Sequence, residues 1–275
     1  MTVAPASPTT STLPPYTIAI CKGSALLEET RALLRAWQQG EPLKGFDDRV
    51  LREDTLGKTT AYRARDIVRR VFARRYLQPD DQVARHLKHL LEVLPYGAWF
   101  SDVCLLYAAR ADQALREVIT DFYWPAMEEG RLTLLPDTVV RFLRDAQSEG
   151  RMEKPWSDAV RLKVARGLLK ALTDFGLLRE VARGRRETVS YHPTDLVLVY
   201  LAHDLHAAGL TDASVVDHTD WDLYGIKRSH RFDVLNRLAG DGWWIAQGAG
   251  AVVRITWKYE TLGEAVDALA GRHVR

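Results

Sequence analysis

Apolar residues recur at helical spacing throughout the first half of the chain. In the segment 62–76, for example, Ile67, Val68, Val71 and Phe72 fall on one stripe of an α-helix. Similar stripes predict further helices over 25–38, 47–53, 80–94, 102–109, 112–124 and 136–147. Because no convincing strand pattern interrupts them, residues 16–150 are predicted to form an all-α bundle.

After Gly150 one pattern occurs twice. The pair Leu168-Leu169 corresponds to Val234-Leu235, and Gly184 corresponds to Gly250. In each copy a helix ends at a glycine and is followed by a strand, a glycine-containing turn and an alternating strand. That order is typical of the end of a winged helix, and the helices over 136–147 and 195–208 are in position to complete each module. The alternative is two unrelated α+β hairpins.

These patterns predict a mainly α fold, with an N-terminal helical bundle followed by helix-turn-helix or winged-helix-like modules with short β-hairpins. Residues 1–15, rich in Pro, Ser and Thr, are expected to be a disordered tail. The remaining predicted boundaries are 16–150 for the bundle, 151–193 for the part that completes the first module, and 194–275 for the second module.

Composition describes an ordinary soluble protein. The 275 residues include 38 Lys and Arg against 36 Asp and Glu, so the net charge of +2 is nearly neutral and any cationic cluster is local. Cys21 and Cys104 form no metal or redox motif and fit a reducing cytoplasm. No signal peptide is apparent, and the apolar stretch 90–109 contains charges that are costly in a bilayer, so we expect a cytoplasmic protein without a membrane partner.

The densest charge lies in 63–75, where six residues are arginine and only Asp66 opposes them. Thr59 or Thr60 is placed to cap this helix. A helix that packs through its apolar stripe and presents cations on its other faces suits the phosphates of nucleic acid. The alternative is a solvated, salt-bridged surface helix. The candidate DNA-binding residues here are Lys58, Arg63, Arg65, Arg69, Arg70 and Arg74.

The first winged copy is basic where such modules meet DNA. The helix over 158–175 has one apolar face, and a different face carries cations suited to the major groove. Its hairpin turn is rich in arginine, which suits the phosphate backbone or the minor groove. The candidate DNA-binding residues here are Lys163, Arg166, Lys170, Arg183, Arg185 and Arg186. The alternative is a winged module that makes protein contacts alone.

The second copy differs in charge. Its turn, residues 248–251, is uncharged, and residues 187–225 contain seven acidic residues and no Lys or Arg. Such a stretch is expected to repel DNA, so the second copy is interpreted as structural or partner-binding. Trp243, Trp244 and Trp257 are assigned to the core.

Enzyme-like patterns are weak. His203 and His206 have the i, i+3 spacing of metal ligands, but no HExxH or paired CxxC accompanies them, and a solvated acidic face explains the neighbouring aspartates equally well. The sequence contains no P-loop, GxSxG or dinucleotide fingerprint. We therefore expect a protein that is not an enzyme and binds neither a metal nor another cofactor.

The order of segments resembles a known family. The stretches YTIAICKGSALLEE at 16–29, LGKTTAYRARDIVRRVFARRYL at 56–77, AARADQALREVITDF at 108–122 and DAVRLKVARGLLKALTDFGLL at 158–178 resemble the BrxA family, small components of bacterial BREX phage-defence systems. The resemblance covers residues 16–192. It implies a helical protein likened to the antitermination factor NusB, with nucleic-acid binding and no known catalysis.

The sequence thus predicts a non-catalytic accessory of a BREX-type defence system that binds the phosphate backbone of double-stranded DNA. It would help other BREX components, such as the methyltransferase, to engage DNA. Two alternatives stay open, a scaffold whose arginines bind acidic surfaces of partner proteins and an RNA-binding, NusB-like protein. The oligomeric state is left undetermined.

Overall fold

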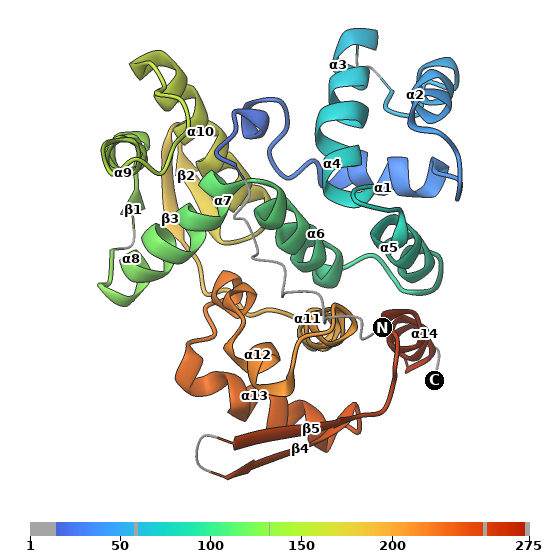
Figure 1. Ribbon diagram of the computed structural model, residues 1–275. Coiled ribbons are helices and arrows are strands. Elements are labelled where there is room, and N and C mark those ends of the chain that lie inside the picture. The colour runs from blue at the N-terminus through green and yellow to red at the C-terminus, as the bar shows by residue number, and fades with distance from the viewer. Residues whose placement is uncertain (1–14, 58–59, 132, 250–251, 273–275) are drawn as a thin grey trace, which may run out of the picture.

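A computed structural model describes residues 15–57, 60–131, 133–249 and 252–272. Figure 1 shows an N-terminal group of helices, a second group that encloses a small sheet, and a C-terminal region that lies beneath both. The predicted disordered tail falls outside the described residues except for Pro15, and Lys58 also lies outside them.

The N-terminal half is helical, as predicted. Its elements in chain order are η1 (Ala19–Cys21), α1 (Leu27–Ala36), α2 (Leu43–Arg52), α3 (Ala61–Asp66), η2 (Ile67–Phe72), α4 (Ala73–Tyr76), α5 (Gln82–Val93), α6 (Ala98–Ala111), α7 (Gln113–Glu117), η3 (Val118–Tyr123) and α8 (Trp124–Glu128). The segments η2 and η3 are π-helical and continue the α-helices on either side of them.

Helix α6 occupies the centre of the molecule, because it is apolar on nearly all sides and must be covered on all of them. It packs against α4, α7 and α11 (Asp195–Ala207), another helix that is buried along most of its length. One continuous hydrophobic core therefore runs from Ile20 to Ala270 through both halves of the chain.

The middle of the chain forms a small antiparallel sheet with two helices. Its elements are β1 (Thr133–Leu134), α9 (Pro136–Ser148), α10 (Asp158–Asp174), β2 (Leu178–Ala182) and β3 (Arg185–Thr188). The strand order is β1-β3-β2, and Leu134 pairs with Arg186. Strand β1 corrects the prediction of an all-α segment up to residue 150; two residues are too few to show strand alternation in the sequence.

The C-terminal region repeats this order in part. Its further elements are α12 (Asp212–Asp217), η4 (Thr219–Tyr224), α13 (Arg228–Gly240), β4 (Trp244–Ala249), β5 (Val252–Trp257) and α14 (Leu262–Arg272). The last helix, α14, packs against α5 and α11 and so ties this region to the N-terminal helices. The mainly α fold class is confirmed, while the boundaries at 150 and 193 stay a prediction.

Candidate nucleic-acid interface

The arginine helix, residues 61–76, consists of α3, η2 and α4. The hydroxyl of Thr60 accepts a hydrogen bond from the backbone N–H of Arg63 and caps its start. The predicted apolar stripe is buried throughout, including Ile67 and Phe72. Arg65, Arg69 and Arg70 are exposed and Arg63 and Arg74 half-buried. The helix therefore packs through its apolar stripe and leaves these five arginines accessible, as the spacing predicted.

Two buried carboxylates neutralise part of this cationic surface. Asp47 of α2 is fully buried, and its Oδ2 accepts hydrogen bonds from Arg69, with Nε at 2.7 Å, while Arg65 lies 3.7 Å away. Asp66 pairs with Lys22 at 2.8 Å and with Arg70 at 3.1 Å. The hydrogen bond from Lys22 lowers the pKa of Asp66, which keeps this carboxylate ionised.

The interpretation that Asp66 alone opposes the arginines was therefore incomplete. Asp47 lies on a different helix, and its approach to Arg69 depends on how α2 packs against α3. The guanidinium groups of Arg63 and Arg74 make no hydrogen bond or ion pair among the described residues, although Arg63 is near enough to Asp66 to lower its pKa. Arg75, the sixth arginine, is buried and donates to the backbone carbonyls of Ser24 and Ala25 at 3.0 and 3.2 Å, so its role is structural.

Helix α10 separates its apolar and cationic faces. The hydroxyl of Ser157 caps its start by accepting from the N–H of Val160. Ala165, Leu168, Leu169 and Leu172 are buried. Lys163, Arg166 and Lys170 are exposed, and of these Lys170 pairs with Asp174 at 2.9 Å. Lys163 and Arg166 have no acidic partner within the described ranges, which leaves both charges available to a ligand.

The hairpin β2–β3 follows α10 directly. Gly184 takes a φ of 76° at its turn, a conformation that glycine adopts without strain. Arg183 is exposed and unpaired in the described part of the chain, whereas Arg185 pairs with Glu187 at 3.2 Å. Arg186 was predicted at the hairpin tip, but it packs back, with its Nε donating to Thr173 of α10 at 3.0 Å.

The acidic stretch at 187–225 is mostly neutralised by arginines, two of which, Arg110 and Arg116, belong to the N-terminal helices. Every acidic side chain from 187 to 222 has a partner, which weakens the repulsion of DNA expected from the sequence. The pairs are Glu187–Arg185, Asp195–Arg237, Asp204–Arg110, Asp217–Arg228, Asp220–Arg116 and Asp222–Arg231, and Asp212 accepts from the N–H of Ile255 and from Trp257.

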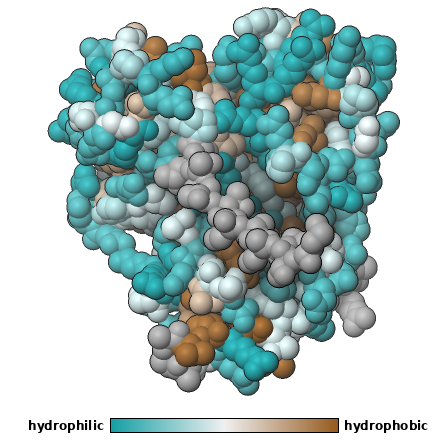
Figure 2. Space-filling model, viewed as in Figure 1, coloured by the Kyte–Doolittle hydropathy of each residue, from teal (hydrophilic) through white to brown (hydrophobic). Residues whose placement is uncertain are grey.

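Figure 2 shows that the surface on this face is largely hydrophilic over α9 and α10 and over α2 and α3. An apolar patch lies instead at the lower end, where β4 and β5 project. Ile245 and Val252 of this hairpin are 60% and 70% exposed. The two hairpins of the chain therefore present opposite surfaces, one cationic and one apolar.

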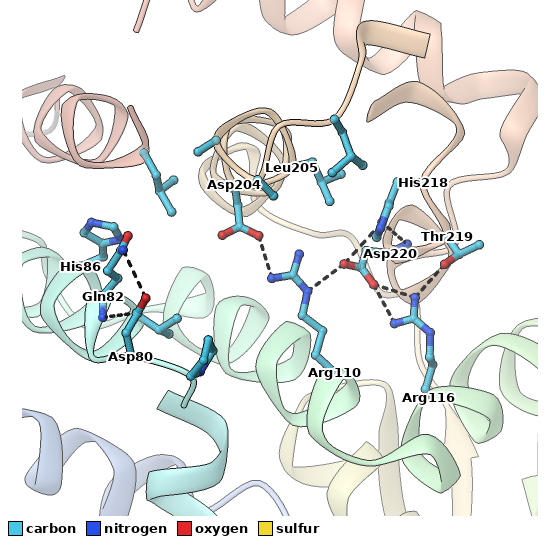
Figure 3. Close-up of a pocket in the computed structure, with 16 residues that line it drawn as sticks. Asp80, Gln82, His86, Arg110, Arg116, Asp204, Leu205, His218, Thr219 and Asp220 are labelled. Atoms are coloured by element: carbon cyan, nitrogen blue, oxygen red, sulfur yellow. Dashed lines mark hydrogen bonds and ion pairs between the residues drawn. The ribbon is translucent and has the colours of Figure 1, made fainter. Parts of the chain in front are cut away.

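A cavity of about 830 Å³ lies between the N-terminal helices and the C-terminal region. Figure 3 shows Arg110 between two carboxylates, and it lies 2.7 Å from Asp204 and 2.8 Å from Asp220. Arg116 pairs with Asp220 at 2.6 Å. Burial alone would raise the pKa of Asp220, but the two guanidinium groups hold it below its usual value. Arg110, Arg116 and the two aspartates thus join the two regions through ion pairs.

The considered metal ligands have other contacts. His203 is buried beside Trp244 and Trp257, and its Nδ1 lies 2.9 Å from the carbonyl oxygen of Val199. His206 stacks on Trp257 with ring centroids 4.3 Å apart. Within the described residues, no group of three or more His, Cys, Asp or Glu side chains is arranged to hold a metal ion.

Across the described residues, no helix has the length and apolarity needed to span a membrane. The family model named BrxA matches residues 14–204, which is more than half of the chain and includes the arginine helix, α10 and the first hairpin. No curated protein matches the chain.

Proposed function

We propose that this chain, which belongs to the BrxA family and is therefore a component of a BREX phage-defence system, binds double-stranded DNA and catalyses no reaction. The proposed contacts are ion pairs with backbone phosphates, made by α10, the β2–β3 hairpin and the arginine helix. Phosphate contacts supply nearly all the non-specific affinity of DNA-binding proteins.

The observation that carries this proposal is the pair of unneutralised cations on α10. Lys163 and Arg166 lie one helical turn apart, both exposed, and have no acidic partner in the described part of the chain. Arg183, also without a partner there, lies on the hairpin that directly follows. Leaving like charges unpaired on adjacent elements is unfavourable for folding, and an anionic ligand would offset that cost.

The order of elements supports a winged helix-turn-helix interpretation of this region. A helical segment, α7 to α8, precedes strand β1, and then come α9, α10 and the hairpin, with the sheet order β1-β3-β2. In such a module α10 is the recognition helix, which enters the major groove, and the hairpin follows the phosphate backbone. The second module, with its apolar hairpin, favours contact with another protein of the BREX system.

The test is a salt series that measures binding of a short labelled DNA duplex by fluorescence anisotropy. The plot of log K against log salt has a negative slope, and each lost phosphate contact makes that slope shallower by about one. We therefore expect Lys163→Ala with Arg166→Ala to make the slope shallower by about two and to weaken binding at every salt concentration.

The matched control is Lys227→Ala with Arg228→Ala at the start of α13. Both side chains are exposed, but they already pair with Glu128 and Asp217, so we expect no change in slope. Absence of duplex binding by the unmodified protein at low salt would overturn the proposal, as would equal losses from both double variants. Competition by structured RNA at lower concentrations than duplex DNA would favour the RNA-binding alternative.

A further inference from the structure

The short helix η1 lies between the two cationic elements. In Figure 1 the blue segment that contains η1 lies between α10 and α3. Gly167 of α10 allows this close packing, since a Cβ there would lie 3.3 Å from Ile20. On the other side, the Nζ atom of Lys22 lies 2.8 Å from Asp66 of the arginine helix.

This contact makes α10 and the arginine helix parts of one cationic surface. The Cys21 thiol of η1 is near the charges of both lysines: burial raises its pKa, Asp112 adds to the rise, and Lys163 and Lys22 oppose it. The surface carries five cations, which are Lys22, Arg63, Arg70, Lys163 and Arg166. Its acidic member, Asp66, has only 8% of its side chain exposed.

An exposed aromatic ring stands beside Lys22. Tyr62 is 70% exposed, and its hydroxyl has no hydrogen-bond partner among the described residues. The Nζ atom of Lys22 lies 5.7 Å from the centroid of the ring. Tyr96, the other exposed tyrosine of the described ranges, is 43% exposed, donates to Glu28 and has Arg31 closer over its ring, at 4.4 Å from the centroid.

We propose that Tyr62 is a base-stacking site, which takes an unpaired nucleobase of DNA whose phosphates are held by Lys22 and the neighbouring arginines. This rests on the proposed DNA binding and adds a preference for DNA that carries a single-stranded end or an opened base pair. An exposed aromatic ring among cations matches the combination that binds single strands, in which the bases stack on aromatic side chains and cations pair with the phosphate backbone. The tyrosine ring stacks on the face of a base, so binding requires no particular base sequence.

The test compares two labelled DNA duplexes of equal length, one blunt and one with a single-stranded overhang. Stacking on one aromatic side chain changes affinity by about five- to a hundredfold. We expect Tyr62→Ala to weaken binding to the overhang duplex by a factor in that range and to leave the blunt duplex unaffected. Tyr62→Phe keeps the ring and should bind both duplexes as the unmodified protein does.

Tyr96→Ala is the matched control, since it removes an exposed tyrosine away from this surface and should leave both affinities unchanged. Equal binding of the overhang duplex by Tyr62→Ala and the unmodified protein would overturn the stacking site but leave duplex binding intact. A loss confined to an RNA overhang would overturn the assignment to DNA. If the unmodified protein binds neither duplex at low salt, the proposed function fails first.

Discussion

The helices that precede the two hairpins carry equal numbers of cations but present different cationic surfaces. Helix α10 contains four Lys or Arg, and α13 together with its preceding residue Lys227 also contains four. On α10 two of them, Lys163 and Arg166, have no acidic partner in the described ranges. At α13 all four pair with an acidic side chain, with partners from α8, α11, α12 and η4.

The number of cations on a helix therefore does not predict an anion-binding surface unless their ion pairs are known. The second module keeps its cations for its own architecture, because Arg231 and Arg237 fasten α13 to η4 and α11. The first module is fastened instead by the packing of α9 on α10 and by the sheet. Two of its helix cations, Lys163 and Arg166, therefore have no acidic partner among the described residues and remain available for binding.

The first prediction concerns the buried ion pairs that attach the second module to the N-terminal helices. Asp220 is nearly fully buried and neutralises both Arg110 and Arg116. We expect Asp220→Ala to lower the free energy of unfolding by about 3–5 kcal/mol, because it leaves buried charge without a partner. Chemical denaturation followed by circular dichroism measures this change.

The exposed pair Asp195–Arg237 provides the control for that measurement. Since exposed ion pairs contribute about 0–1 kcal/mol, Asp195→Ala should change stability little. A similar small loss for Asp220→Ala would mean that the buried ion pairs do not fasten the second module, and the contrast between the modules would then rest on DNA binding alone.

The second expected effect is a pH dependence that belongs to the second module. Burial among aromatic rings lowers the pKa of His203 to about 4 from its usual value of 6.5. A lowered histidine pKa contributes stability that is complete above pH 6.5 and is lost as the pH falls toward 4. The pKa shift corresponds to a loss of about 3 kcal/mol in the free energy of unfolding when His203 becomes protonated. We expect the free energy of unfolding of His203→Phe to vary less between pH 6.5 and pH 4 than that of the unmodified protein. Chemical denaturation at several pH values in this range measures the difference.

The smallest expected effect compares single arginines on the two hairpins. Arg183 and Arg254 are both exposed, and neither has a partner among the described residues. We expect Arg183→Ala to make the slope of log K against log salt for duplex DNA shallower by about one, and Arg254→Ala to leave it unchanged. A larger change from Arg254→Ala would place DNA on the second hairpin and reverse the comparison.

Local features of the arginine helix and of the first module were predictable from sequence. The apolar stripe of the arginine helix, the cap at Thr60, the exposed cations of α10 and the glycine turn at Gly184 depend on residues within a few positions of one another. Family membership was also recognisable, because the similar segments span several helices.

Features that depend on contacts between distant segments were not predictable. Asp47 meets Arg69 only because α2 packs on the arginine helix, and nothing near Asp47 in the sequence marks it as buried. The same holds for Lys22, whose place between the arginine helix and α10 depends on η1. The inward turn of Arg186 follows from the pairing of β3 with β1 and β2, and β1 is too short to leave a pattern.

The position of η1 also sets the order in which the cationic surface is completed during synthesis. Residues near the N-terminus bond to partners made much later, with Thr17 donating to Asp112 at 2.8 Å and Ser24 donating to Asp174 at 2.5 Å. The arginine helix leaves the ribosome well before α10. The segment that contains η1 can pack between the two only after α10 has emerged as far as Asp174, the partner of Ser24. A partly synthesised chain thus has the arginine helix but not the complete cationic surface. The surface is complete only after the first hairpin module has been synthesised.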